Sequence, residues 1–282
     1  MAKEWDPQFG QRHPGIETLH PASDWPRWAD WPGVDDLQAL LDASPEPVVN
    51  ASGSALRLSG LQAALPAADY ERCVAREARL AVRLPGWHDV FNVLAWAAWP
   101  KAKAVLNARH VVEIERHVGS NRSSVRDALT GFDEDGVVVC VSDLRLERLA
   151  REFRWKALFW EARAALANDF RVFVFGHALA EKLLAPFVGL TAKAVFIRSV
   201  PGLAEQPVDQ QRATLDRQLA DIISDPCGFV TPAELTPLPV LGLPGWWPGG
   251  EDAAFYDDAA YFRPGRGWRS SASRQPNSEL HR

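Results

Sequence analysis

Three short runs rich in β-branched and aromatic residues stand out in the second half of the chain, at 137–141, 170–175 and 194–200. Runs of this length and composition are typical of buried strands. The segments around them carry apolar residues at helical spacing instead. Such alternation predicts a mixed α+β or α/β fold, in which several packed helices cover a small mixed sheet around a single main core.

The most regular helical pattern lies at 207–224, where Leu215, Leu219 and Ile223 share one face and Pro226 follows the end. Amphipathic spacing predicts several other helices. They are expected at 34–42, from residue 88 to the break at 100, at 101–118, from a cap at 142 or 143 through 153, at 155–168 and at 177–184.

Other segments are predicted to be extended. Residues 70–84 alternate irregularly between apolar and charged side chains. The stretch 127–143 predicts a hairpin, because Asp135–Gly136 supplies the positive φ of a tight turn. The strand, helix and strand order of 170–200 suggests a βαβ-like unit, although the short crossover leaves an antiparallel arrangement open.

The composition along the chain predicts three regions. Residues 1–33 are rich in Trp and Pro and are expected to form an irregular arm that packs its indoles on the body. Residues 34–263 form a single globular α/β domain in this interpretation. The Arg- and Ser-rich segment 264–282 is expected to be a disordered tail.

Charge argues against nucleic acid as the main partner. The net charge is −5, and four arginines against one acid gather in the tail, which leaves a more acidic body. The three cysteines form no CxxC pair, and no segment has the roughly 20 apolar residues of a membrane span. These features predict a cytoplasmic protein away from membranes. Its partner could be a small molecule or another protein.

Motifs of the common enzyme classes are absent from the sequence. It contains no GxGxxG after a strand, no GxxxxGK[ST], no HExxH and no GxSxG. Simple nucleotide-binding, metalloprotease and α/β-hydrolase functions are therefore disfavoured, and no cofactor is identified.

The first candidate site group stands at the start of a predicted helix and comprises His88, Asp89 and Asn92. The positive end of a helix disfavours a protonated imidazole, so His88 suits a neutral base or a metal ligand. Asn92 falls one turn later on the same side. Capping of the helix by Asp89 is the simpler alternative.

The second group, His177, Glu181 and Lys182, follows a β-rich run, and open α/β sheets place ligands at the ends of strands. His177 and Glu181 are four residues apart and share a helix face, so the carboxylate would raise the basicity of the imidazole or share a metal with it. A solvated face, with Glu181 paired to neighbours of Lys182, is the alternative.

Acidic residues elsewhere have simpler interpretations. Asp127 begins the predicted extended run beside Arg126, and a surface salt bridge between them explains both. The run 133–135 reads as an acidic turn, because a calcium loop would need Glu where Leu144 stands.

His110, Glu113 and His117 fall on one side of a predicted helix. Their spacing permits a one-sided metal site. The charged residues around them favour a solvated face instead.

Four blocks of the sequence resemble a bacterial family known as domain of unknown function 3025. They are GWHDVFNVLAWAAWPKAKAVLN (86–107), RDALTGFDEDG (126–136), VFGHALAEKLLAP (174–186) and LPGWWPGGEDAAFYDDAAYFRP (243–264). The resemblance brings no activity, cofactor or substrate. It implies that the polar members of the blocks form one constellation, namely His88, Asp89, Asn92, Asp127, Thr130, His177, Glu181 and Lys182.

Two functions fit these residues. One is a hydrolase-like enzyme with His88 or His177 as base and Asp89, Asp127 and Glu181 as orienting groups or ligands of zinc, manganese or iron. The other is a non-catalytic binding or scaffolding protein whose polar groups are buried and hydrogen-bonded. The enzyme requires His88, Asp127 and His177 to converge on a cavity that solvent reaches.

Overall fold

The computed structural model describes residues 4–19, 27–116, 123–200 and 202–265. Residues 266–282, which are all but the first two of the predicted tail 264–282, and Trp25 of the arm lie outside the described residues. The helices are α1 (Pro14–Glu17), α2 (Val34–Asp42), α3 (Ala67–Glu77), α4 (Trp87–Ala98), α5 (Pro100–Arg116), α6 (Ser124–Asp135), α7 (Leu144–Arg151), α8 (Arg163–Asp169), α9 (His177–Lys182) and α10 (Val208–Ser224). Shorter 3₁₀ turns lie at Phe9–Gln11, Pro232–Glu234, Val240–Gly242, Pro248–Glu251 and Ala253–Asp257, and a π-helical turn lies at Ala157–Glu161.

The strands form two sheets. They are β1 (Arg57–Gly60), β2 (Arg79–Val82), β3 (Gly136–Val141), β4 (Phe170–Val174), β5 (Thr191–Arg198) and β6 (Thr236–Pro239). β1 and β2 pair in parallel, and the larger sheet has the order β4-β3-β5-β6. Because β3 is antiparallel to β4 and parallel to β5, β4 and β5 neither adjoin nor run in the same direction, and residues 170–200 form no βαβ unit.

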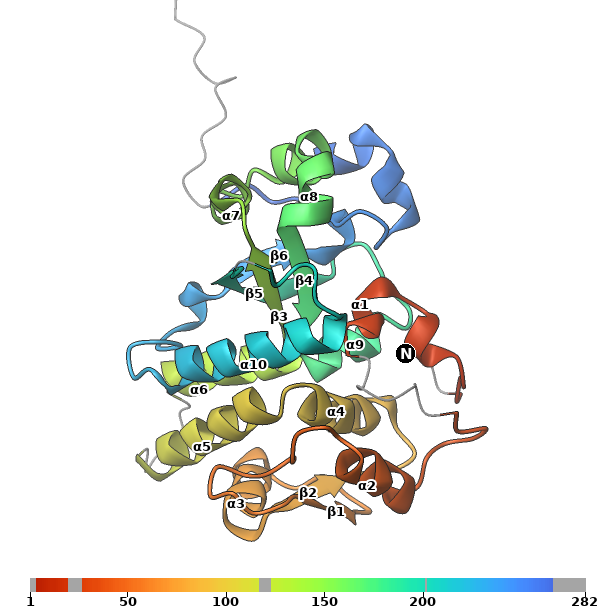
Figure 1. Ribbon diagram of the computed structural model, residues 1–282, viewed down its shortest axis with the longest axis vertical. Helices are drawn as coiled ribbons and strands as arrows, with labels where there is room; N and C mark the ends of the chain where they lie inside the picture. The colour runs from red at the N-terminus through yellow and green to blue at the C-terminus, as the bar shows by residue number, and fades with distance from the viewer. Residues whose placement is uncertain (1–3, 20–26, 117–122, 201, 266–282) are drawn as a thin grey trace, which may run out of the picture.

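Helices separate the two sheets. Figure 1 shows α4 and α5 following one another across the molecule, with α6, α10 and the larger sheet on one side and β1, β2, α2 and α3 on the other. All six residues of β3 are buried, as expected for a central strand covered on both faces. The mixed fold predicted from the sequence is confirmed. Within the described residues, no helix combines the length and apolarity needed to cross a membrane.

The predicted hairpin at 127–143 is wrong. Residues 124–135 form α6, and β3 begins directly at Gly136, whose φ of −73° is ordinary extended backbone. The apolar residues Ala128, Leu129 and Phe132 recur at helical spacing and are all buried. Because Asp135–Gly136 is a strong turn signal, it outweighed this longer period in the sequence-based prediction.

The extended segment predicted at 70–84 is wrong in its first half. Residues 67–77 form α3, and only 79–82 form a strand, β2. Tyr70, Cys73 and Val74 mark the buried side of the helix at i, i+3 and i+4. Ala78 ends the helix in the left-handed conformation, with a φ of 49°.

Tryptophans of the arm pack on the start of α4. The Trp5 ring stacks on Trp87 with centroids 4.7 Å apart, and Trp31 packs at 5.0 Å from Trp87. At the other end of α4, the Trp99 indole donates to the carbonyl of Val174 in β4 at 2.9 Å. The helix is therefore fixed at both ends, and Trp87 adjoins His88.

Gly176 joins β4 to α9 where the chain passes closest to the end of α6. A Cβ at this position would lie 2.4 Å from the carbonyl oxygen of Glu134 and 2.4 Å from the amide of Gly136. The amides of Phe175 and Gly176 both donate to the Gly136 carbonyl, at 3.0 and 2.9 Å. Only a glycine permits this approach, which holds His177 beside Glu134.

We predict that Gly176→Ala lowers the free energy of unfolding by about 1–3 kcal/mol, because the methyl group must push two backbones apart. Gly131→Ala is the matched control, since a Cβ on this residue of α6 would have no neighbour within 4 Å. That control should gain up to about 1 kcal/mol from better helix propensity. Urea denaturation of both variants tests this, and equal stability of the two would contradict it.

Candidate functional site

Two imidazoles from the first and third of the four sequence blocks meet in the structure. His88 lies in the first turn of α4, and His177 begins α9 directly after β4. Their Nε2 atoms are 3.2 Å apart, and their ring planes are inclined by 73°. The fold thus brings together two of the three residues whose convergence the enzyme hypothesis required, and the third, Asp127, does not line the cavity beside them.

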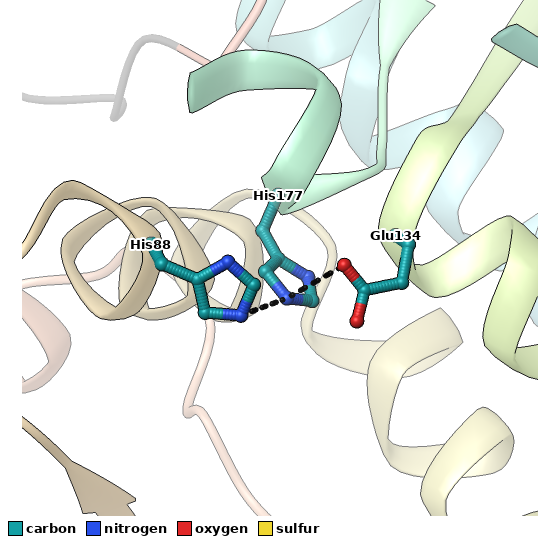
Figure 2. A group of neighbouring side chains, drawn as sticks. All are labelled: His88, Glu134 and His177. Carbon is teal, nitrogen blue, oxygen red and sulfur yellow. Dashed lines mark hydrogen bonds and ion pairs between the residues drawn. The ribbon is translucent and has the colours of Figure 1, made fainter. Parts of the chain in front are cut away.

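Glu134 is the third member of this group. It lies in the last turn of α6, and its Oε2 is 3.8 Å from Nε2 of His177. One donor atom from each of the three residues lies within 4.8 Å of the other two, and Figure 2 shows the side chains facing one another. The acidic turn predicted at 133–135 is wrong, because these residues end a helix that carries them into the site.

The two imidazoles have opposite environments. The His177 side chain is 6% exposed, and burial, its largest influence, lowers the pKa of His177 to about 3. The His88 side chain is 38% exposed, and its hydrogen bond with Glu181 raises the pKa of His88. His177 is therefore neutral near pH 7, and His88 is the member of the pair that holds an extra proton more readily.

Glu181 pairs with a different histidine from the one predicted. Its Oε2 lies 3.5 Å from Nδ1 of His88, across the space between α9 and α4. A proton on Nδ1 of His88 would leave Nε2 facing His177 and Glu134. Lys182 points elsewhere and pairs with Asp135 at 2.6 Å.

A buried lysine, Lys103, connects side chains next to the histidines through hydrogen bonds. Lys103 is 3% exposed, and its ammonium donates to Asp133 at 2.6 Å and to Asn92 at 3.1 Å. The Asn92 amide in turn donates to the hydroxyl of Tyr70 at 2.8 Å. Burial, the largest influence, acts to raise the pKa of Asp133, but the charge and hydrogen bond of Lys103 lead the opposing influences, and the pKa lies below its ordinary value. Asn92 therefore belongs to the supporting network.

The remaining predicted site residues lie around this centre. Asp89 does not cap α4, but accepts from the amide of Arg83 at 2.6 Å and from its guanidinium at 3.0 and 3.1 Å. Asp127 is an exposed residue in the first turn of α6, not in an extended run, and lies outside the lining of the site cavity. Thr130, one turn further along α6, lines it.

A cavity of about 190 Å³ opens beside the histidines. Glu71 lines it together with His110, and burial raises the pKa of Glu71 to about 7. The solvated face predicted for the 110, 113 and 117 positions is wrong for His110 and Glu113, which are both buried. His117 lies outside the described residues.

Sequence reasoning missed Glu134, Asp133, Lys103 and Glu71. A signal for Glu134 was present, because residues 126, 130 and 134 recur every four positions, as on one face of a helix. The other three belong to helices whose packing brings distant segments together, and no local pattern marks such contacts.

We predict that Lys103→Met destabilises the protein by about 3–5 kcal/mol, because it leaves the Asp133 carboxylate buried without its partner. The double variant Lys103→Met, Asp133→Asn should recover part of that loss, since the unpaired charge is then removed. Denaturation of both variants and of Asp133→Asn alone measures the coupling. Additive effects of the two substitutions would show that the pair is not coupled.

A family model matches this chain. The model of the family described as "Protein of unknown function (DUF3025)" matches residues 60–266, which include all three residues of the His–His–Glu group. No curated protein and no solved structure matches the chain. The family match spans most of the chain and covers the four blocks that carried the resemblance in the sequence. The chain therefore belongs to the DUF3025 family.

Proposed function

We propose that this protein is a metal-dependent hydrolase whose divalent transition-metal ion is held by His88, Glu134 and His177. The observation that carries the proposal is the convergence of three donor atoms, from α4, α6 and α9, within 4.8 Å of one another. Two imidazoles and one carboxylate are a donor set that suits zinc, iron or manganese. Bound there, the metal would supply Lewis acidity and lower the pKa of a water molecule.

The distances support a shared ion. Two nitrogens at roughly 2.0–2.1 Å from a tetrahedral zinc lie about 3.3 Å from each other, and the Nε2 atoms of His88 and His177 are 3.2 Å apart. The Oε2 atom of Glu134 lies 3.8 Å from Nε2 of His177, and a side-chain rotation that brings it closer would let it share the ion. Three protein ligands leave a coordination position for water or substrate, as in catalytic zinc sites.

Groups around the ligands fit the same role. Glu181 on Nδ1 of His88 is the kind of carboxylate that orients a ligating imidazole and raises its basicity. The low pKa of His177, caused by burial, keeps that ring neutral and free to bind. Glu71 lines the same cavity, and its pKa of about 7 suits proton transfer at neutral pH, so we assign it that role.

A second candidate function is non-catalytic binding or scaffolding, in which the two histidines only hold the fold together. The observation in its favour is the direct contact between the imidazoles. With one ring nitrogen donating and the other accepting at 3.2 Å, His88 and His177 satisfy each other without an ion.

Metal content is the first test. Protein purified without chelators and loaded in turn with zinc, iron(II) or manganese should hold about one equivalent by elemental analysis. His88→Ala, His177→Ala and Glu134→Gln should each lose it, whereas His110→Gln, a histidine of the same cavity outside the group of three, should retain it. If no metal is bound after any of the loadings, the metal-dependent function is wrong and the scaffold function is favoured.

Turnover is measured on the same samples. The metal-loaded protein should hydrolyse members of a panel of aryl carboxylic and phosphoric esters, and Glu134→Gln should abolish that activity. Retention of one equivalent of metal with no hydrolysis of any ester would argue against a hydrolase and for a metal-binding role.

The role of Glu181 gives a separate prediction. Glu181→Gln should weaken metal affinity about 10- to 100-fold while preserving one site, because the amide orients His88 less strongly. Lys182→Gln, the adjacent residue, whose partner is Asp135, should leave affinity unchanged. Competition with a chromophoric chelator measures both, and equal affinities would show that Glu181 does not support the site.

A further inference from the structure

Arg126 lines the site cavity, and its side chain makes no hydrogen bond or ion pair with the described residues. It lies in the first half of α6 and lines the cavity together with Thr130 and Glu134. Its Nε is buried and has no hydrogen-bond partner, and its guanidinium forms no ion pair with a carboxylate of the described residues. Its positive charge acts at longer range on Glu71, which lines the same cavity. The surface salt bridge predicted between Arg126 and Asp127 does not form. A buried N–H donor that lacks an acceptor is costly unless something binds it.

The other cations near the cavity are already engaged. The Arg83 guanidinium makes two hydrogen bonds to Asp89, and the Lys103 ammonium is 2.6 Å from Asp133. Of these three described cations, Arg126 is therefore the one with a buried N–H donor available to a ligand.

The spacing along α6 relates Arg126 to the His–His–Glu group. Residues 126, 130 and 134 are separated by four positions each and lie on one face of the helix. At 1.5 Å per residue, the Cα atoms of Arg126 and Glu134 are about 12 Å apart along the helix axis. Both side chains extend from the helix toward the cavity, which shortens the distance between the guanidinium and the metal-binding atoms of the His–His–Glu group. Only a small molecule can therefore bridge the two.

We infer that Arg126 binds an oxyanion of the substrate, a carboxylate or a phosphate, while the other end of the substrate reacts at the His–His–Glu group. The guanidinium presents paired donors that match either oxyanion. Leu61 and Leu65 also line the cavity and would contact a short apolar linker between the two ends. This inference rests on the proposed function and names its substrate class: small acids with a second polar group a few carbons away.

The test uses small probes that differ in one end. Glutarate and 4-phosphonobutyrate carry an oxyanion at both ends, whereas butyrate carries one. By isothermal titration calorimetry on zinc-loaded protein, one of the two should bind at least tenfold more tightly than butyrate. The tighter of the pair identifies carboxylate or phosphate as the preferred group.

Substitutions locate the effect. Arg126→Gln should remove the tenfold advantage without changing zinc content, and Arg126→Lys should retain part of it because charge remains but the paired geometry is lost. Arg148→Gln, on an exposed residue of α7, is the control for loss of positive charge and should behave as wild type. Thermal melts confirm that each variant is folded.

The outcomes separate this inference from the proposed function. Metal binding with no advantage for the doubly anionic probes, or an advantage that survives Arg126→Gln, overturns the inference and leaves the metal site standing. If the protein binds no metal, the same titrations on metal-free protein decide: glutarate or 4-phosphonobutyrate binding that Arg126→Gln weakens tenfold supports an oxyanion site, and unchanged binding overturns it.

Discussion

The close contact between Gly176 and the junction of α6 and β3 is the constraint on which the site depends. The Gly136 carbonyl accepts two amide hydrogen bonds from the end of β4, and the missing side chain of Gly176 lets the two backbones touch. His177 is the next residue along, and Glu134 stands two residues before β3. The ligand geometry is therefore set by backbone packing in the sheet, which is more rigid than a loop.

Sequence patterns predicted those elements whose signal is local. The helix 208–224 and the central runs of β3 and β4 follow directly from apolar spacing. The pairing of β3 between β4 and β5 did not follow, because it depends on which segments pack together and not on any one segment. In the segment 124–135, the dipeptide Asp135–Gly136 indicates a turn, whereas the spacing of the apolar residues indicates a helix. The helix forms because it buries the face that contains Leu129 and Phe132.

The same limits apply to the site. His88 and His177 were identifiable because each begins a helix within a block of the family resemblance, and the structure brings them into contact. Glu181 was assigned to the wrong histidine, since i and i+4 residues share a helix face but long side chains also reach neighbouring helices. Its carboxylate crosses to His88 on α4.

The charges around the histidines show why this group differs from an ordinary buried network. Three carboxylates pair with fixed cations, Asp133 with Lys103, Asp135 with Lys182 and Asp89 with Arg83.

Glu134 and Glu181, in contrast, form their ion pairs among the described residues with the two imidazoles. Their two negative charges then face rings of which one, His177, is held neutral by burial. A proton on His88 offsets one of those charges, which accords with the raised pKa of that ring. A divalent cation bound between the rings would offset both, and that balance is the electrostatic argument for a metal at this position.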